Sequence, residues 1–405
     1  MNYSNCILKT IGFFSNPYKN QDFIDNGFNK IFVKDETINF LNKSYHSEYI
    51  NLMFNNSPNE FGVTKLEKKI DVEIEIINHK NKVIVNSITL FNFFDSFKKD
   101  QFSIFSVDYK VLSSNLDDLS DCIVSLKNPD SLIKLSSKEI SLDTFLQQSI
   151  IKENFIDENS AVSQYAGYKY KHYLVTDFEK EEFNRDDLLF ELGTSSKINS
   201  IRNQDLDSPS IKYKNQVLEN KISCFNNYEC LTLLDSFTVV GRNNYNPNEI
   251  YNHNSWNNIY FSIYIFNLYV KASIQVISNS FSEDSVNKRK EFKEFYNKYF
   301  FVKISFNFLP NEIYKGISNS LEIDEDIDFI KERLETLAVQ VNEKQQKQIG
   351  LILLVISVIA LLETPLHIEG IRKIIGIDAL VIYNSAVYFL LVFSVVIFLY
   401  QNLKK

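Results

Sequence analysis

Two long apolar runs lie near the C-terminal end of the chain. Residues 349–362 read IGLILLVISVIALL, and residues 379–400 form a run of 22 residues without a formal charge. The second run is long enough to cross a hydrocarbon layer of about 30 Å, and the first run is long enough if its helix continues to residue 368. The pattern therefore predicts two C-terminal transmembrane helices, at about 349–368 and 379–400.

A narrow apolar stripe precedes the first run. Its six members are spaced four, three, four, three and four residues apart, which is the a/d spacing of a coiled coil. No Gly or Pro separates the stripe from residue 349, so the pattern predicts a stalk helix that continues into the membrane. Such a stripe packs either against copies of the same chain or against its own soluble domain. Its members are Ile323, Ile327, Ile330, Leu334, Leu337 and Val341.

The rest of the chain alternates between strand-like and helix-like patterns. A turn at 78–82 between two β-branched runs predicts a hairpin, and the polar stretch 157–164 predicts a domain boundary. The run 255–281 is apolar but interrupted by asparagine and lysine, so we expect a core helix rather than a third span. Further strands are expected at 71–77, 83–91, 102–112 and 165–177, and helices at 142–154 and 186–192, the last ending at Gly193.

Together these patterns predict an α/β (α+β) cytoplasmic region, a long coiled-coil-like stalk helix and two C-terminal transmembrane helices. The expected parts are an N-terminal α/β domain at 1–156, a second α/β sensor unit at 157–284, a helical stalk at 285–348 and a transmembrane hairpin at 349–405. Basic residues outside the two spans favour a multi-pass protein of the inner (plasma) membrane with both termini in the cytoplasm. These residues are Lys344, Lys347, Lys404 and Lys405.

Composition and charge exclude several classes of protein. Of the 405 residues, 44% are hydrophobic and 23% are charged, so the chain can bury a large core and is not disordered as a whole. The formal net charge of −8 argues against wholesale attraction to nucleic acid or to an anionic membrane surface. The four cysteines lack the spacing of a zinc site, and the first residues lack the pattern of a signal peptide.

The sequence contains no enzyme signature. The five histidines stand in unrelated contexts, and no nucleophile elbow, Walker loop or dinucleotide fingerprint occurs. The stretch from Gly193 to Lys197 (GTSSK) is similar to a phosphate loop but lacks its first glycine, so we interpret it as a capped helix end followed by a loop. We therefore expect no catalytic residues, no metal site and no cofactor.

Two groups of residues are candidates for ligand recognition. Tyr168 and Tyr170 alternate with lysines, a pairing that stacks bases and neutralises phosphates, although an edge strand with tyrosines on one face explains it equally. Because arginine is scarce in this sequence, Arg202 and Arg242 in polar loops stand out as phosphate-binding groups, with Lys197 as a further cation. These five residues form the predicted site for an anionic nucleotide or oligonucleotide.

Three polar residues in the predicted spans are candidates for a pore. Glu363, Asn384 and Ser385 face water or protein if they lie at bilayer depth. For Glu363 the alternative is an exposed interfacial position beside Pro365. Two spans cannot enclose a pore alone, so a channel requires a homo-oligomer in the lipid bilayer, expected to be a tetramer or pentamer.

The segment Val341-Asn-Glu-Lys-Gln-Gln-Lys-Gln348 followed by residues 349–362 resembles the CorA family of divalent-cation transporters. The Gly-Met-Asn motif of that family is absent, and this chain has Glu363-Thr-Pro-Leu-His-Ile-Glu-Gly370 instead. The plan of the chain also resembles membrane effectors of bacterial nucleotidyltransferase-paired anti-phage defence, of the Hailong kind. The resemblance implies a homo-oligomeric channel effector gated by a ligand on its cytoplasmic domain. The alternatives are a CorA-like divalent cation transporter and a membrane-anchored binding protein that does not conduct.

Overall fold

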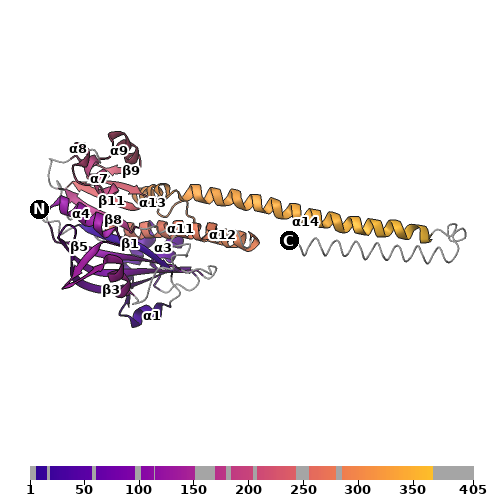
Figure 1. Ribbon diagram of the computed structural model, residues 1–405, viewed down its shortest axis with the longest axis horizontal. Coiled ribbons are helices and arrows are strands. Elements are labelled where there is room, and N and C mark those ends of the chain that lie inside the picture. The colour runs from indigo at the N-terminus through magenta and orange to yellow at the C-terminus, as the bar shows by residue number, and fades with distance from the viewer. Residues whose placement is uncertain are drawn as a thin grey trace. The chain divides into compact units, whose positions relative to one another are not determined.

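The computed structural model describes ten ranges of the chain. Contacts between residues divide it into two compact units, unit 1 (Met1–Ile330) and unit 2 (Lys331–Lys405). The long helix α14 (Ile323–His367) begins in unit 1 and continues in unit 2 (Figure 1). The described ranges are 6–15, 19–56, 61–95, 102–113, 115–150, 169–178, 184–203, 208–242, 255–279 and 285–367.

Unit 1 is built on one mixed sheet of eleven strands. The strands lie in the order β7-β6-β3-β4-β5-β1-β8-β11-β10-β9, and β2 pairs with β3. Among the described pairings β8 and β11 are parallel, and the other neighbours are antiparallel. The bounds are β1 (Ile7–Ser15), β2 (Asn29–Lys30), β3 (Phe61–Ile76), β4 (Asn81–Asp95), β5 (Phe102–Val111), β6 (Leu132–Leu135), β7 (Lys138–Ser141), β8 (Lys171–Phe178), β9 (Lys221–Phe225), β10 (Tyr228–Leu233) and β11 (Ser236–Arg242).

The predicted hairpin is confirmed as the pair β3–β4, and the predicted strand 102–112 is confirmed as β5. In β4 the buried positions change from odd to even numbers, because Val83 and Val85 are followed by Ile88 and Leu90 in the same core cluster. The register of β4 against β5 shifts between Val85 and Ser87. Such a bulge adds one residue to the strand and returns the later side chains to the same face.

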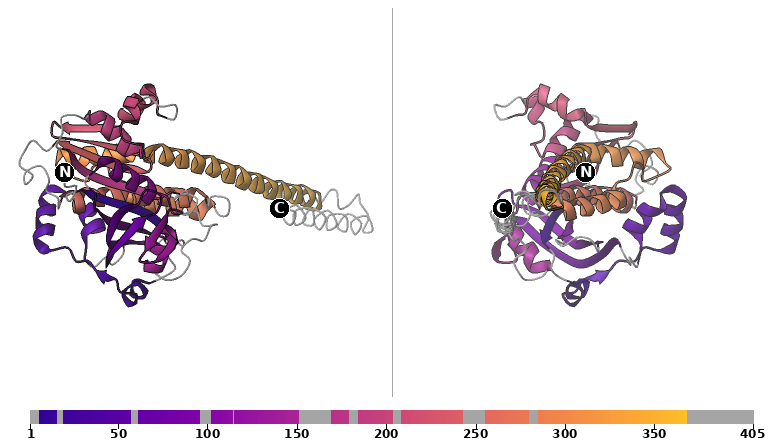
Figure 2. Two further views of the ribbon diagram at one scale, coloured as in Figure 1. Left: turned by 60° about the vertical axis from the view of Figure 1, so that its left-hand side comes forward. Right: turned by 90° about the vertical axis from the view of Figure 1, so that its right-hand side faces the viewer.

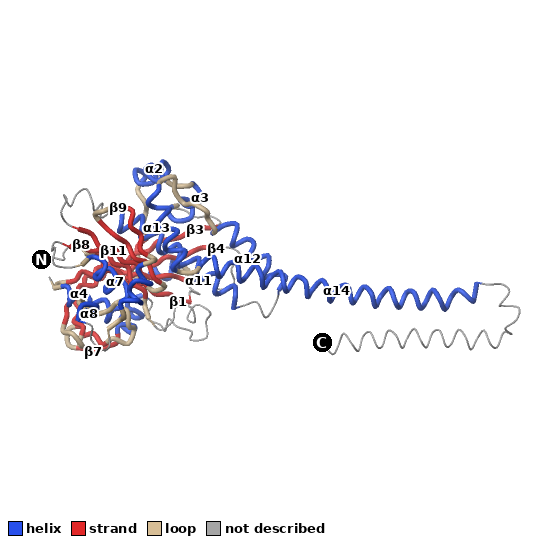
Figure 3. Tube along the Cα trace, turned by 90° about the horizontal axis from the view of Figure 1, so that it is seen from above, coloured by secondary structure: helices blue, strands red, loops and turns tan. Residues whose placement is uncertain are grey.

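Helices cover both faces of the sheet (Figures 2 and 3). On one face, a Cβ at Gly193 of α7 (Arg185–Thr194) would lie 2.7 Å from a terminal methyl carbon of Leu231 of β10, so the helix packs closely on the strand at this glycine. On the other face, a Cβ at Gly316 of α13 would lie 2.4 Å from Ile222 of β9. The helices of unit 1, besides the start of α14, are α1 (Asn20–Asp25), α2 (Asp35–Ser44), α3 (Ser47–Phe54), α4 (Leu116–Leu126), α5 (Leu142–Ile150), α7 (Arg185–Thr194), α8 (Ser200–Asn203), α9 (Ile211–Leu218), a π-helical turn (Ser255–Tyr260), α11 (Phe261–Asn279), α12 (Ser285–Tyr299) and α13 (Phe308–Ser320).

The end of α7 differs from the predicted glycine cap. The helix continues to Thr194, and Ser195 adopts the left-handed conformation with φ 58°. The Ser196 N–H then donates to the Glu191 carbonyl at 2.8 Å, which closes the helix end. Gly193 is therefore a position of close contact with Leu231 of β10, and the left-handed residue at the helix end is Ser195.

The apolar segment Ser255–Ser278 is a core helix, as predicted. Phe261 packs edge-on against Phe91 of β4 and against Tyr173 of β8, and most of the segment is buried. One of its polar residues, Asn267, has a partner within the helix, since its amide donates to the Ile263 carbonyl at 2.9 Å. Strand β8 itself lies between β1 and β11, so the tyrosine-rich segment is not an edge strand.

The predicted architecture of a coiled-coil stalk with two C-terminal transmembrane helices is wrong. Among the described residues, the helix long and apolar enough to cross a membrane is the buried segment Ser255–Ser278. The first stripe residues, Ile323, Ile327 and Ile330, are buried within unit 1, because a four-three spacing also forms the single apolar face of a helix that packs on its own domain. Further along the stripe Leu334 is buried, Leu337 is half-buried, and the Val341 side chain and residues 379–400 lie outside the described residues.

Candidate functional site

Tyr170, one of the two predicted stacking residues, is part of the core. Its hydroxyl donates to Asp143 Oδ1 at 2.7 Å, and its ring packs edge-on against Phe105. Burial and the neighbouring Asp143 carboxylate raise the pKa of Tyr170. Tyr168 lies outside the described residues. The structure therefore offers no exposed face of Tyr170 for a base.

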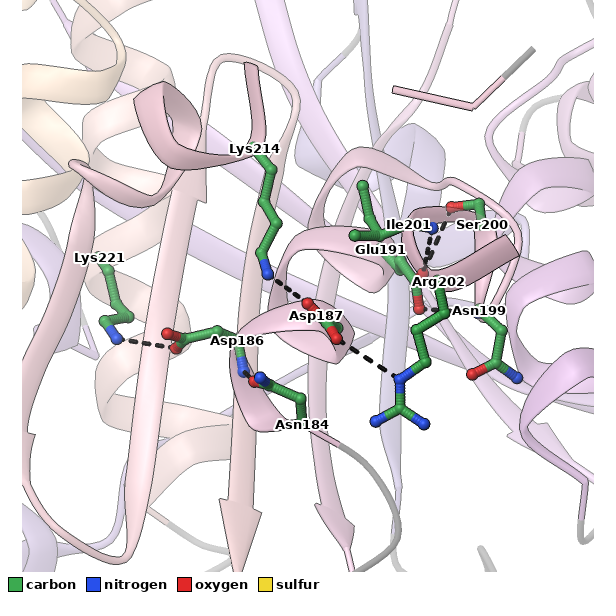
Figure 4. A network of polar contacts seen from close by, with 10 residues as sticks. All are labelled: Asn184, Asp186, Asp187, Glu191, Asn199, Ser200, Ile201, Arg202, Lys214 and Lys221. Carbon is green, nitrogen blue, oxygen red and sulfur yellow. Dashed lines mark hydrogen bonds and ion pairs between the residues drawn. The ribbon is translucent and has the colours of Figure 1, made fainter. Parts of the chain in front are cut away.

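The predicted cations occupy three different settings. Lys197 is exposed in the loop after α7. Arg202, on α8, lies with its Nε 3.6 Å from Asp187 Oδ2 of α7 (Figure 4). Arg242 is the last residue of β11, and its side chain lies outside the described residues. Arg202 thus contributes to a network of ion pairs within the fold.

This network joins α7 to the elements around it (Figure 4). Asp187 also pairs with Lys214 of α9, and Asp186 accepts from Lys221 of β9 at 2.8 Å. The buried Glu191 carboxylate accepts from the Asn199 N–H at 3.0 Å and from two further groups of α8. Burial raises the pKa of Glu191, and these hydrogen bonds oppose the rise. The network crosslinks four elements, and its acidic groups have partners, which indicates a structural role.

A second polar group lies where α4, α7 and the turn between β10 and β11 meet. Lys127 Nζ donates to Asp235 Oδ2 at 2.6 Å and to Ser195 Oγ at 3.1 Å. We call these three residues the Lys127 cluster. The Lys127 side chain is 7% exposed, whereas the Asp235 side chain is 44% exposed. Burial alone would raise the pKa of Asp235, but the Lys127 ammonium holds it below its usual range.

His172 and Lys171 at the start of β8 adjoin the cluster. The backbone N–H of His172 donates to the backbone carbonyl of Asp235 at 3.1 Å. The Nε2 atom of the His172 ring is within hydrogen-bond distance of Thr238 Oγ1. Complete burial, together with the Lys127 charge, lowers the pKa of His172 to about 3, so the ring is neutral at physiological pH. Burial lowers the pKa of Lys171 to about 8, although Asp235 opposes that change.

The arrangement of the Lys127 cluster does not fit nucleophilic catalysis. A serine nucleophile needs a neighbouring group that can take its proton. Lys127 is the closest candidate for Ser195, but its ammonium donates to the Asp235 carboxylate. The cluster is instead equipped to hold an anion, because a fixed ammonium and a hydroxyl both present donors.

A further ion pair connects the interior of unit 1 to the first turn of α14. Lys271 of α11 is buried, and its Nζ lies 2.8 Å from Asp326 Oδ2. Lys271 is also close enough to contribute to the electrostatic environment of Lys171. The Lys171 side chain is therefore within electrostatic reach of two other cations, Lys127 in the Lys127 cluster and Lys271 at the base of α14.

No sequence motif marks the Lys127 cluster. Lys127 and Asp235 are 108 positions apart, and both belong to residue types that are common in this chain. The ion pair at the base of α14 did have a sequence signal. Lys271 stands in an apolar run, and a lysine in such a run predicts a buried carboxylate partner.

The side chains of the three predicted pore residues lie outside the described part of the structure. Glu363 lies in α14, but its side chain is outside the described residues, as are Asn384 and Ser385 entirely. Among the described residues, no group of three or more His, Cys, Asp or Glu side chains could hold a metal ion.

Comparison with known proteins identifies no relative. No family model, no curated protein and no solved structure matches the chain. The resemblances to CorA transporters and to anti-phage effectors therefore gain no support from relatives, and a functional proposal has to start from the contacts described above.

Proposed function

We propose that the protein acts by binding rather than by catalysis, and that α14 attaches it to a lipid bilayer. The proposal rests on one observation: in unit 2, α14 exposes a run of large apolar side chains. Contiguous exposed apolar surface of this kind marks an interaction site on a protein. The exposed residues are Ile349, Ile352, Leu353, Leu354 and Ile356.

The distribution of these residues around the helix favours lipid as the partner. Successive helical residues point about 100° apart, so Ile352, Leu353 and Leu354 point in three different directions. A helix that docks in a protein groove needs one apolar face, whereas a helix that is apolar all round is surrounded by core or by lipid. At Gly350 a Cβ would meet no atom within 4 Å, so this part of the helix is open on that side as well.

The proposal places unit 1 in the cytoplasm beside the inner membrane, where a ligand bound to unit 1 would change the behaviour of the membrane-bound form. Self-association through α14 belongs to the same proposal, because apolar helices in lipid pack against one another. Conduction, divalent-cation transport and a part in antiviral defence stay predictions drawn from the sequence layout.

A local fluorescence measurement tests the membrane contact. The full chain would carry Leu353→Cys labelled with the environment-sensitive dye NBD. The matched control would carry Val302→Cys, since Val302 is the most exposed large apolar residue in the described part of unit 1. Labelled wild type corrects for the native cysteines. With vesicles of phosphatidylethanolamine and phosphatidylglycerol, we expect a blue shift and quenching by brominated acyl chains at position 353 and neither at position 302.

The dye reports the environment of one residue, so it distinguishes attachment through α14 from attachment through another part of the chain. Emission at position 353 that stays unshifted and unquenched, while the chain is recovered with the vesicles, would refute attachment through this segment of α14.

A further inference from the structure

The Lys127 cluster combines a buried cation with a partly exposed anion. Lys127 ends α4, and its carbonyl accepts from the Tyr170 N–H at 2.8 Å, so both ends of the residue are held. Asp235 stands in the short turn between β10, which ends at Leu233, and β11, which begins at Ser236. Its side chain is partly in solvent, so rotation of the carboxylate toward water needs little rearrangement.

We propose that Lys127 and Ser195 form a binding site for a small phosphate-bearing anion, and that the Asp235 carboxylate occupies the place of this ligand. The ligand enters from the solvent side of Asp235 and accepts hydrogen bonds from the Lys127 ammonium and the Ser195 hydroxyl. Lys197, two positions after Ser195, is exposed on the same loop. This inference goes beyond membrane attachment and does not depend on it.

The chemistry of the donors favours phosphate over a second carboxylate. Lysine presents three donors as a compact charge, and Lys127 directs two of them to Asp235 and Ser195. A phosphate group carries up to two negative charges and three acceptor oxygens, so it can take both donors and gain more from the ammonium than a carboxylate does. Asp235 is then released to solvent, where its charge is hydrated.

In the GTSSK segment, Gly193 to Lys197, the proposed site uses side-chain donors and not the backbone donors of a phosphate loop. Backbone N–H groups cradle the phosphates in such loops. Here the Ser195 and Ser196 N–H groups donate to Leu192 and Glu191 carbonyls and are already used. The donors of the site are therefore side chains: the Lys127 ammonium, which contacts both Asp235 and the Ser195 Oγ, and the Ser195 hydroxyl beside it.

Removal of the competing carboxylate provides the test. In titration calorimetry of the detergent-solubilised full chain with inorganic phosphate and with a nucleoside monophosphate, Asp235→Asn should bind at least about ten-fold more tightly than wild type, because the native anion no longer competes. The matched control is Asp186→Asn, which removes a carboxylate paired with Lys221 in the network of Figure 4 and should leave phosphate affinity unchanged.

A second variant shows whether Lys127 is the cation that binds. Asp235→Asn combined with Lys127→Met removes both charges of the pair, so neither member is left buried without the other, and we expect the fold to be retained. Fluorescence of Trp256, which is buried in unit 1, reports that retention. We expect the double variant to lose the binding gained by Asp235→Asn.

Two results would overturn the proposal. One is phosphate affinity of Asp235→Asn no higher than that of Asp186→Asn. The other is binding that survives in a folded double variant. A water-soluble short-chain phosphatidic acid, titrated in parallel, distinguishes a lipid headgroup from a free phosphate ester as the source of the phosphate, and tighter binding of either one to Asp235→Asn supports the site.

Discussion

Two segments of α14 contain similar apolar residues in opposite environments. Ile323, Ile327 and Ile330 are at most 2% exposed in unit 1, whereas Ile352 and Leu353 in unit 2 are about half exposed. The difference follows from spacing, because the first set forms one stripe and the second set surrounds the helix. A one-sided stripe is satisfied by the domain from which the helix starts. A helix that is apolar on all sides needs a different environment.

The largest effect is expected from the buried stripe. Ile330→Ala removes a fully buried side chain and should lower the free energy of unfolding by about 2–5 kcal/mol, through lost burial and a cavity. Urea denaturation of the detergent-solubilised chain, followed by Trp256 fluorescence, measures the change in unit 1. Ile352→Ala is the matched control on the same helix.

If both alanine variants unfold at the same urea concentration, Ile330 does not stabilise unit 1 as its burial indicates. The comparison between the two segments of α14 would then fail, and burial of the stripe by another copy of the chain would become the better interpretation.

The next largest effect concerns the ion pair at the base of α14. Asp326→Asn leaves the buried Lys271 ammonium without its carboxylate and should lower the free energy of unfolding by about 1–3 kcal/mol. Lys271→Met together with Asp326→Leu should restore most of this loss, since neither charge then remains. A double variant that unfolds as easily as Asp326→Asn would show that the pair does not fix the start of α14.

Local elements of the fold were predictable from the sequence, and their assembly was not. The hairpin β3–β4, strand β5, helix α7 and the buried helix α11 all have local signatures in apolar spacing and turn residues. The order of strands was not accessible, because β1 pairs with strands that are distant in the sequence. Leu8 lies opposite Tyr109 of β5, 101 positions further along the chain, and Thr10 lies opposite His172 of β8, 162 positions further along. Strands from both predicted α/β parts join one sheet for the same reason.

The candidate site was less predictable than the fold. Tyr170 was selected because tyrosines alternate with lysines, and Arg202 because arginine is scarce in this chain. The structure shows that both have internal partners, Asp143 and Asp187. Lys127 was overlooked because lysine is abundant here, and its significance comes from burial, which depends on how α4, α7 and β11 meet. Only the folded chain brings Ser195 and Asp235 to the same ammonium.

A smaller effect is expected from His172 as the pH falls. The pKa of His172 is lowered to about 3 in the folded chain, against about 6.5 when unfolded, so the unfolded chain binds the extra proton between these values. The free energy of unfolding should therefore fall with pH from about 6.5 toward 3, by up to about 1.4 kcal/mol per pH unit from this residue.

His172→Gln should reduce that slope, measured by urea denaturation at pH 7, 6 and 5. Equal slopes for the variant and wild type would contradict the assignment of a neutral, buried ring. Asp235 does not account for a change in the free energy of unfolding between pH 7 and 5. Its pKa is lowered in the folded chain, so the stability that its ion pair contributes is lost only at more acidic pH.

The smallest effect on stability is expected where α14 is most exposed. Leu353→Ser combined with Leu354→Ser changes two side chains that make few contacts, so the free energy of unfolding of unit 1 should change by less than about 0.5 kcal/mol. The same variant should nevertheless need less detergent to stay dispersed, because exposed apolar area is what detergent covers. Urea denaturation and the lowest detergent concentration that prevents sedimentation measure the two quantities on one sample. A loss of stability comparable to that of Ile330→Ala would mean that residues 353 and 354 are covered by protein, and the contrast between the two segments of α14 would then disappear.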